Sequence, residues 1–266
     1  MRELINKMFD FFSRKKNFID KFYGLRFLDK KIESEVDLLS AQKVIYCFWT
    51  GENDLSENRK KSLNILEKHA GVEVRLITPL NLMDYILPDF PLHPAYEFLS
   101  LVHRSDYLRC YFMYHHGGGY ADVKANYYDW SASFKFLNEC KDKFAVGYSE
   151  TRKEDIGYVR SFVGKKNAKK INKDLKSNYH LVIGNGSYIF KPHSPLAQLW
   201  YHELHLRLDE HLDELKKYPG NIMGDNEGYP LPWTSILGQI FHPLCLVFCE
   251  NLIIDDGLRP ILTNYR

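Results

Sequence analysis

Short apolar segments alternate with amphipathic segments along most of the chain from residue 43 onward. Segments rich in β-branched and aromatic residues and bounded by turn residues predict strands. The predicted strands are 43–49, 72–77, 120–123, 145–148, 181–190 and 244–249. Segments with apolar residues every three or four positions predict helices. The predicted helices are 57–69, 81–87, 95–116, 195–217 and 233–241. Strands that alternate with helices favour a single α/β domain.

The start of the chain has a different pattern, which predicts a helical extension over 1–42 ahead of the domain over 43–266. Within residues 1–31, nine Lys and Arg side chains oppose four acidic ones, and seven aromatic side chains lie among them at roughly helical spacing. A basic helix with an aromatic face suits peripheral contact with an anionic membrane. The alternative is that this aromatic face packs on the body of the protein.

Composition narrows the class of protein further. The chain is 45% hydrophobic and 26% charged, which is typical of a globular domain and excludes a disordered or fibrous chain. Its net charge of +2 disfavours a protein that binds nucleic acid. We find no apolar run long enough for a membrane span and no signal-peptide pattern. Five cysteines without a CxxC pair favour free thiols and a cytoplasmic location.

Candidate chemistry is concentrated between residues 106 and 122. Asp106 and Arg109 are spaced i and i+3, so they share one face of the predicted helix. Three glycines at 117–119 end that helix, and Asp122 follows at the exit of a short strand that begins at Tyr120. Ligands of α/β folds bind at the carboxyl edge of the sheet. The alternative is an ordinary surface pair followed by an ordinary helix end.

Two motifs separated by seven residues resemble the DXD region of glycosyltransferase family 32, and most closely its bacterial capsular polysaccharide synthesis branch. They are Ser105-Asp106-x-x-Arg109 and Gly117-Gly118-x-Tyr120-x-Asp122. The segment is also similar to the large clostridial glucosylating toxins. An upstream strand that ends at Trp49 is typical of such enzymes, and 185–195 resembles their later Asn-containing strand.

The resemblance implies a GT-A fold, which is Rossmann-like and binds a nucleotide sugar. It implies transfer of a hexose or related sugar to a polysaccharide or lipopolysaccharide acceptor, with retention of configuration. The residues implied to bind the donor are Trp49, Asp106, Arg109, Tyr120, Asp122, Lys124 and Asn185. Trp49 would stack on the base, which favours UDP, while Asp106 and Arg109 would bind sugar hydroxyls. Tyr120 would lie against the ribose or diphosphate, and no catalytic nucleophile is identified.

One position departs from the family pattern, because Lys124 stands where the second acid of the DXD motif is usual. The resemblance implies Mn²⁺ or Mg²⁺ at Asp122, but a protonated lysine does not ligate a metal. Either Asp122 binds the metal with a ligand from elsewhere, or Lys124 itself neutralises the diphosphate. Asp225 and His242 are candidate further ligands or lid residues, and Trp233 is interpreted as a core residue or a wall of the acceptor site.

Two other functions remain open. A degenerate, non-catalytic module that binds nucleotide sugar is favoured by Lys124. A metal-dependent enzyme similar to nucleotidyltransferases would usually need two close acids, which the Asp122-Val123-Lys124 segment does not supply.

Overall fold

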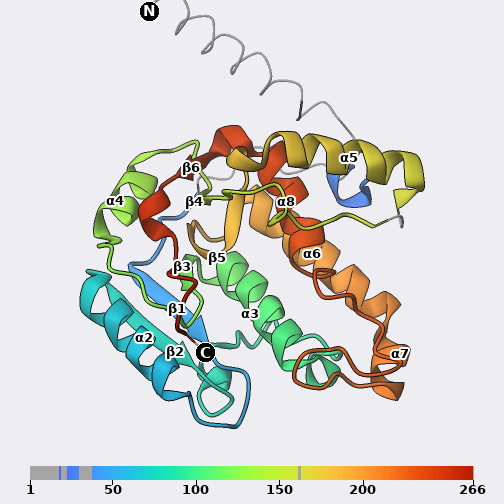
Figure 1. Cartoon of the computed structure of the whole chain (residues 1–266), viewed down its shortest axis with the longest axis horizontal. Helices are drawn as coiled ribbons and strands as arrows, with labels where there is room; N and C mark the ends of the chain where they lie inside the picture. The colour runs from blue at the N-terminus through green and yellow to red at the C-terminus, as the bar shows by residue number, and fades with distance from the viewer. Residues whose placement is uncertain (1–17, 19–22, 30–37, 161–162, 266) are drawn as a thin grey trace, which may run out of the picture.

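A computed structural model of the chain describes residues 18, 23–29, 38–160 and 163–265. Most of the predicted N-terminal extension therefore lies outside the described residues, including 1–17. Figure 1 shows a central sheet with helices against both of its faces. The predicted α/β class is confirmed, and the fold is consistent with a Rossmann-like GT-A domain.

The sheet has six strands in the order β2-β1-β3-β5-β4-β6. Their bounds are Val44–Phe48 for β1, Glu73–Ile77 for β2, Gly118–Ala121 for β3, Ala145–Ser149 for β4, Ile183–Phe190 for β5 and Leu252–Ile254 for β6. β5 pairs antiparallel with both β3 and β4, whereas the other neighbouring pairs are parallel. The carboxyl ends of β1, β3 and β4 therefore lie at one edge, together with the amino end of β5.

In the part of the chain that the structure describes, seven α-helices surround this sheet. Their bounds are Glu57–His69 for α2, Leu101–His115 for α3, Ser131–Glu139 for α4, Lys165–Ser177 for α5, Pro195–Glu210 for α6, Leu212–Lys217 for α7 and Gly238–Val247 for α8. The prediction of α2 is confirmed, and the Ser56 side chain caps it by accepting from the backbone N–H of Arg59. The predicted helix 195–217 is divided at His211, and α4 and α5 were not predicted.

Two predictions near the C-terminus were wrong. Residues 244–249, predicted as a strand, lie at the end of α8 and the start of the following 3-10 turn. All ten residues of α8 are buried, and a continuous apolar run does not distinguish a buried helix from a buried strand. The predicted helix 233–241 begins only at Gly238. Trp233 precedes it and is 54% exposed, so it is not a core residue.

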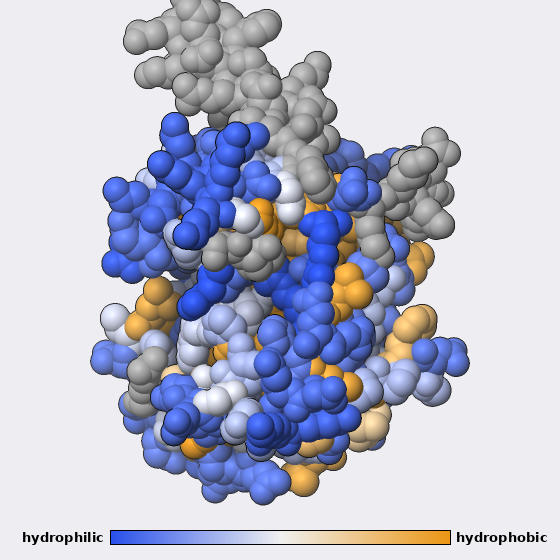
Figure 2. Space-filling view, turned by 90° about the vertical axis from the view of Figure 1, so that its right-hand side faces the viewer, coloured by the Kyte–Doolittle hydropathy of each residue, from blue (hydrophilic) through white to orange (hydrophobic). Residues whose placement is uncertain are grey.

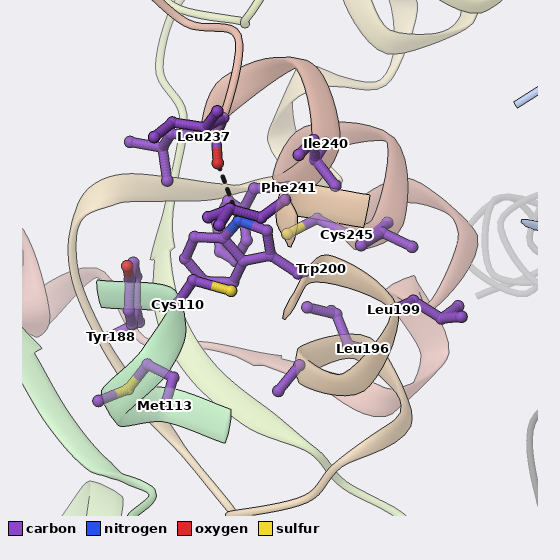
Figure 3. Close-up of a cluster of buried hydrophobic side chains, with 14 of the residues drawn as sticks. Cys110, Met113, Tyr188, Leu196, Leu199, Trp200, Leu237, Ile240, Phe241 and Cys245 are labelled. Carbon is purple, nitrogen blue, oxygen red and sulfur yellow. Dashed lines mark hydrogen bonds between the residues drawn. The ribbon is translucent and has the colours of Figure 1, made fainter. Parts of the chain in front are cut away.

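Helices cover the sheet through two apolar layers. α3, α6 and α8 pack on one face, where Trp200 and Phe241 lie with ring centroids 4.8 Å apart. Figure 3 shows this cluster, in which the Trp200 indole N–H donates to the Ile236 carbonyl at 3.1 Å. α2 and α4 cover the other face around Trp130 and Phe134. Burial on both faces explains why β1 is apolar at every position.

The described part of the N-terminal segment packs into the first of these layers. Phe18, Leu25 and Phe27 are all buried there, and Arg26 forms ion pairs with Glu203 and Glu210 of α6. These side chains are therefore part of the folded domain.

The face of the molecule that Figure 2 shows is largely polar. Figure 2 shows apolar side chains on one face as small separate groups among hydrophilic ones. Among the described residues, no helix combines the length and apolarity needed to cross a bilayer. All five cysteines are free, as predicted.

Candidate functional site

Helix α3 carries the first two residues of the site. The Ser100 side chain caps the helix by accepting from the backbone N–H of His103 at 3.2 Å. Asp106 and Arg109 follow on one face, and their side chains are only 4% and 13% exposed. A carboxyl group and a guanidinium held out of water in this way are not an ordinary surface pair.

The chain then reverses from α3 directly into β3. Gly117 and Gly118 have φ of 63° and 88°, a region that favours glycine. A Cβ on Gly117 would also lie 2.7 Å from the backbone nitrogen of Pro192, so a larger residue does not fit. The short reversal delivers Asp122 to the carboxyl end of β3, where its backbone N–H donates to the Gly186 carbonyl at 2.8 Å.

Asp122 is the centre of a charged cluster. Lys124 Nζ lies 2.6 Å from its Oδ2, and Arg109 Nη2 lies 3.3 Å from its Oδ1. The Tyr120 hydroxyl also donates to Asp122 Oδ1. The Arg109 guanidinium lies 4.6 Å from the centroid of the Tyr120 ring and 3.7 Å from Asp106 Oδ1. Two cations thus face two carboxylates at one strand end.

The two carboxylates of the cluster have opposite pKa shifts. Burial raises the pKa of Asp106 to about 7, although Arg109 acts to lower it. Burial would also raise the pKa of Asp122, but the charges of Arg109 and Lys124 hold it below its usual value. At neutral pH, Asp122 is therefore ionised while Asp106 is close to its midpoint.

This shift predicts a pH dependence of stability. The folded protein binds a proton at Asp106 more tightly than the unfolded chain, whose ordinary value is 3.8. The contribution of Asp106 is therefore fully present below pH 4 and lost as pH rises toward 7, by up to about 1.4 kcal/mol per pH unit. Urea unfolding measures the effect. The free energy of unfolding of the wild type minus that of Asp106→Asn should fall as the pH rises over this range. A difference that does not change with pH would contradict the shift.

The antiparallel strand β5 brings Asn185 to the same place. Its backbone carbonyl accepts from Arg109 Nη1 at 3.1 Å. The Asn185 Oδ1 atom, Arg109 Nε and the Tyr188 hydroxyl are buried without a hydrogen-bond partner among the described residues. Buried polar atoms are normally paired in folded proteins. Three such atoms lie around one cluster, where water or a polar ligand would pair with them.

Trp49 directly follows β1, the parallel neighbour of β3, and so lies at the same edge of the sheet. Its indole N–H donates to the Asn53 carbonyl at 2.6 Å, which orients the ring. The side chain is partly exposed.

Two residues near the cluster were missed in the sequence. Glu150 follows β4, is 8% exposed, and burial together with Asp155 raises its pKa to about 7. Tyr265 lies between two cations, with its ring centroid 4.6 Å from the Arg59 guanidinium and 4.9 Å from Lys124 Nζ. Only Glu150 could have been found from the sequence, because it follows a predicted strand.

The other candidates lie apart from the Asp122 contacts. Asp225 is exposed and accepts from Asn221, in a loop whose Gly220 N–H donates to the Phe98 carbonyl just before α3. His242 is fully buried in α8, and its Nδ1 accepts from the Gly157 N–H at 2.7 Å. Burial lowers its pKa to about 4, so it is neutral.

The residues around Asp122 do not fit a protein metal site. Both of its carboxylate oxygens are already paired with cations, and Lys124 occupies the position of a second ligand. Within the described part of the chain, no three His, Cys, Asp or Glu side chains form a group that could hold a metal ion.

A separate hollow of about 500 Å³ lies beside α6 and the segment around Arg26. Its Glu203 carboxylate is 2.8 Å from both Arg26 Nε and Arg207 Nε. These charges neutralise one another, and the hollow lies away from the carboxyl edge of the sheet, whereas Asp122 follows β3 at that edge, where α/β folds bind ligands. We therefore place the candidate site at Asp122.

Comparison with known proteins gives one match to a family. Residues 6–182 match the capsular polysaccharide synthesis protein family, a span that includes α3, β3 and the Asp122 cluster but ends before Asn185. No curated protein matches the chain. Because the match covers about two thirds of the sequence, the chain belongs to the capsular polysaccharide synthesis protein family.

Proposed function

We propose that the protein is a glycosyltransferase that moves a hexose or related sugar from a nucleotide sugar to a saccharide or glycolipid acceptor. The observation that carries this proposal is the cluster of Arg109, Asp122 and Lys124 at the carboxyl edge of the sheet, beside unpaired buried polar atoms. Family membership supports a role in polysaccharide synthesis. The likeness of the two motifs to the DXD region of glycosyltransferase family 32 supports the same chemistry.

In this proposal the cations stabilise the leaving diphosphate. Transfer breaks the bond between the anomeric carbon and a diphosphate oxygen, so negative charge grows on that oxygen. Lys124 and Arg109 carry the positive charge that would stabilise it. Arg109 is fixed by Asp122 and the Asn185 carbonyl, so little reorganisation is needed during the reaction.

The other residues bind and orient the donor. Asp106 and the Asn185 amide present polar atoms suited to sugar hydroxyls, and Trp49 presents a ring suited to a base, with UDP favoured. The acceptor hydroxyl forms the new bond to the anomeric carbon, and its proton passes to an oxygen of the departing diphosphate. This front-face route retains configuration and needs no enzyme nucleophile.

Lys124 takes the place of a metal in this scheme. The implied Mn²⁺ or Mg²⁺ would neutralise the diphosphate, but both carboxylate oxygens of Asp122 are already paired with cations of the protein. A lysine placed 2.6 Å from Asp122 supplies the same sign of charge. We therefore infer donor binding that does not depend on a divalent cation.

Thermal unfolding with nucleotides tests the proposal. UDP or a UDP-sugar at 100 times its Kd should stabilise the protein by about 2.7 kcal/mol, equally with Mn²⁺ and with EDTA. Lys124→Ala should lose this stabilisation, whereas Lys141→Ala, a change in the loop before β4, should keep it. Stabilisation that disappears in EDTA would show that Asp122 binds a divalent metal ion. No response to UDP, GDP, CMP or their sugars would overturn the donor site.

A non-catalytic module that binds nucleotide sugar is the second candidate, and Lys124 at a family acid position favours it. Donor hydrolysis separates the two, because a working transferase slowly hydrolyses its donor without acceptor. The binding module would respond in thermal unfolding and release no free sugar.

A further inference from the structure

Helix α5 carries an unusual concentration of positive charge. Its thirteen residues include one acid, Asp174, and six lysines. The lysines are Lys165, Lys166, Lys169, Lys170, Lys173 and Lys176. All six are exposed. The helix alone therefore has a formal charge of +5, whereas the whole chain has +2.

The lysines are confined to one side of the helix. Ala168, Ile171 and Leu175 are buried and fix α5 against the domain, and Asn172 exchanges two hydrogen bonds with the Val159 backbone. With 3.6 residues per turn, the six lysines fall within an arc of about 140° and extend over about 16 Å of the axis. They form a continuous basic strip, which we call the α5 lysine face.

This face is not neutralised by the domain. Asp174, outside the lysine arc, accepts a hydrogen bond from the Tyr23 hydroxyl at 2.7 Å. Within the described residues, none of the six lysines forms an ion pair with an acidic side chain. Positive charges held close together without counter-ions attract an anionic partner.

A shallow hollow gives this face a second feature. It has a volume of about 420 Å³ and is lined by four of the lysines together with Tyr158 and Asn172. Tyr158 is 57% exposed, and Lys176 Nζ lies 5.8 Å from its ring centroid. Tyrosine beside lysine is typical of the interface between a membrane and water.

The position of α5 suits contact with a flat surface. Figure 1 shows α5 along the outer edge of the molecule, far from α2. Tyr23 lies beside it, since Lys170 Nζ is 5.4 Å from the Tyr23 ring centroid. The described residues around Tyr23 therefore lie beside this helix.

We propose that the α5 lysine face docks the protein on an anionic bilayer, with phosphate headgroups in the hollow beside Tyr158. A bilayer offers an extended negative surface that matches an exposed lysine strip. Docking rests on the surface of α5 and does not require the proposed transfer reaction.

Vesicle sedimentation of the full chain tests this proposal. We expect binding to vesicles of 30% phosphatidylglycerol in phosphatidylcholine, weak binding to phosphatidylcholine alone, and weaker binding at high salt. One lysine near such a surface contributes about fivefold to partitioning. The triple variant Lys166→Gln, Lys169→Gln, Lys173→Gln should therefore bind about 100-fold less. Glutamine keeps the helix propensity, and circular dichroism checks the fold.

A matched control separates the effect of the α5 lysine face from the effect of net charge. Lys60→Gln, Lys61→Gln, Lys68→Gln removes the same charge from exposed positions of α2 and should bind the vesicles as the wild type does. Both variants keep residues 1–31, so their difference reports α5.

Four results would overturn the proposal. The first is equal binding by the α5 variant and the wild type. The second is an equal loss in the α2 control. The third is release by millimolar glycerol phosphate, and the fourth is retention on an acidic polysaccharide without vesicle binding. Either of these two results would assign the face to a soluble anion.

Discussion

Replacing Asp122 by Asn is expected to lower the rate of sugar transfer about 10³-fold while the fold is kept. The carboxylate positions both cations of the site, with Lys124 at 2.6 Å and Arg109 at 3.3 Å. An amide of the same shape carries no charge to hold them. Both cations would then lose the orientation toward the diphosphate that the proposal requires.

Initial rates with a radiolabelled UDP-sugar measure this effect. Asp142→Asn is the matched control, because Asp142 also pairs with a lysine, Lys143 at 2.9 Å, but is 70% exposed and lies in the loop before β4. The control should retain wild-type activity. An Asp122→Asn protein that is folded and within a factor of three of the wild-type rate would exclude Asp122 from the reaction.

Replacing Arg109 by Leu is expected to reduce the free energy of unfolding by about 3 kcal/mol at pH 8. The change leaves Asp106 without its cation and Asp122 with Lys124 alone. Removing one partner from a buried charge cluster costs more than the pair itself contributes, because the remaining charge stays out of water. At pH 5 the loss should be smaller, since protonation removes the charge of Asp106, whose pKa is about 7.

Urea unfolding at both pH values measures the effect. The double variant Arg109→Leu, Asp106→Asn should recover part of the loss at pH 8, because the uncompensated carboxylate is gone. Arg75→Leu serves as the control, since Arg75 pairs with Glu73 on the surface and such pairs contribute at most about 1 kcal/mol. A loss below 1 kcal/mol for Arg109→Leu would show that the cluster does not need its guanidinium.

Local spacing was enough to predict the part of the site that one stretch of chain supplies. Asp106 and Arg109 share a helix face because i and i+3 residues always do, and Asp122 lies close by because three glycines permit an immediate reversal. The helix α2 was predicted with the bounds that the structure has, 57–69, because its apolar residues recur at helical spacing. The strand prediction at 244–249 was wrong because an unbroken apolar run has no period.

By itself, the sequence determined the α/β class, the α3–β3 reversal and the grouping of Asp106, Arg109 and Asp122, because these depend on interactions between residues close in the chain. Only the tertiary structure decided the rest. The antiparallel pairing of β5 with β3 brings Asn185 beside Arg109, and the C-terminal return brings Tyr265 to Lys124. The unneutralised charge of the α5 lysine face is likewise visible only once its neighbours are known. Such features depend on which distant residues meet in the fold. The sequence does not predict them, because contacts between distant residues leave no periodic signal along the chain.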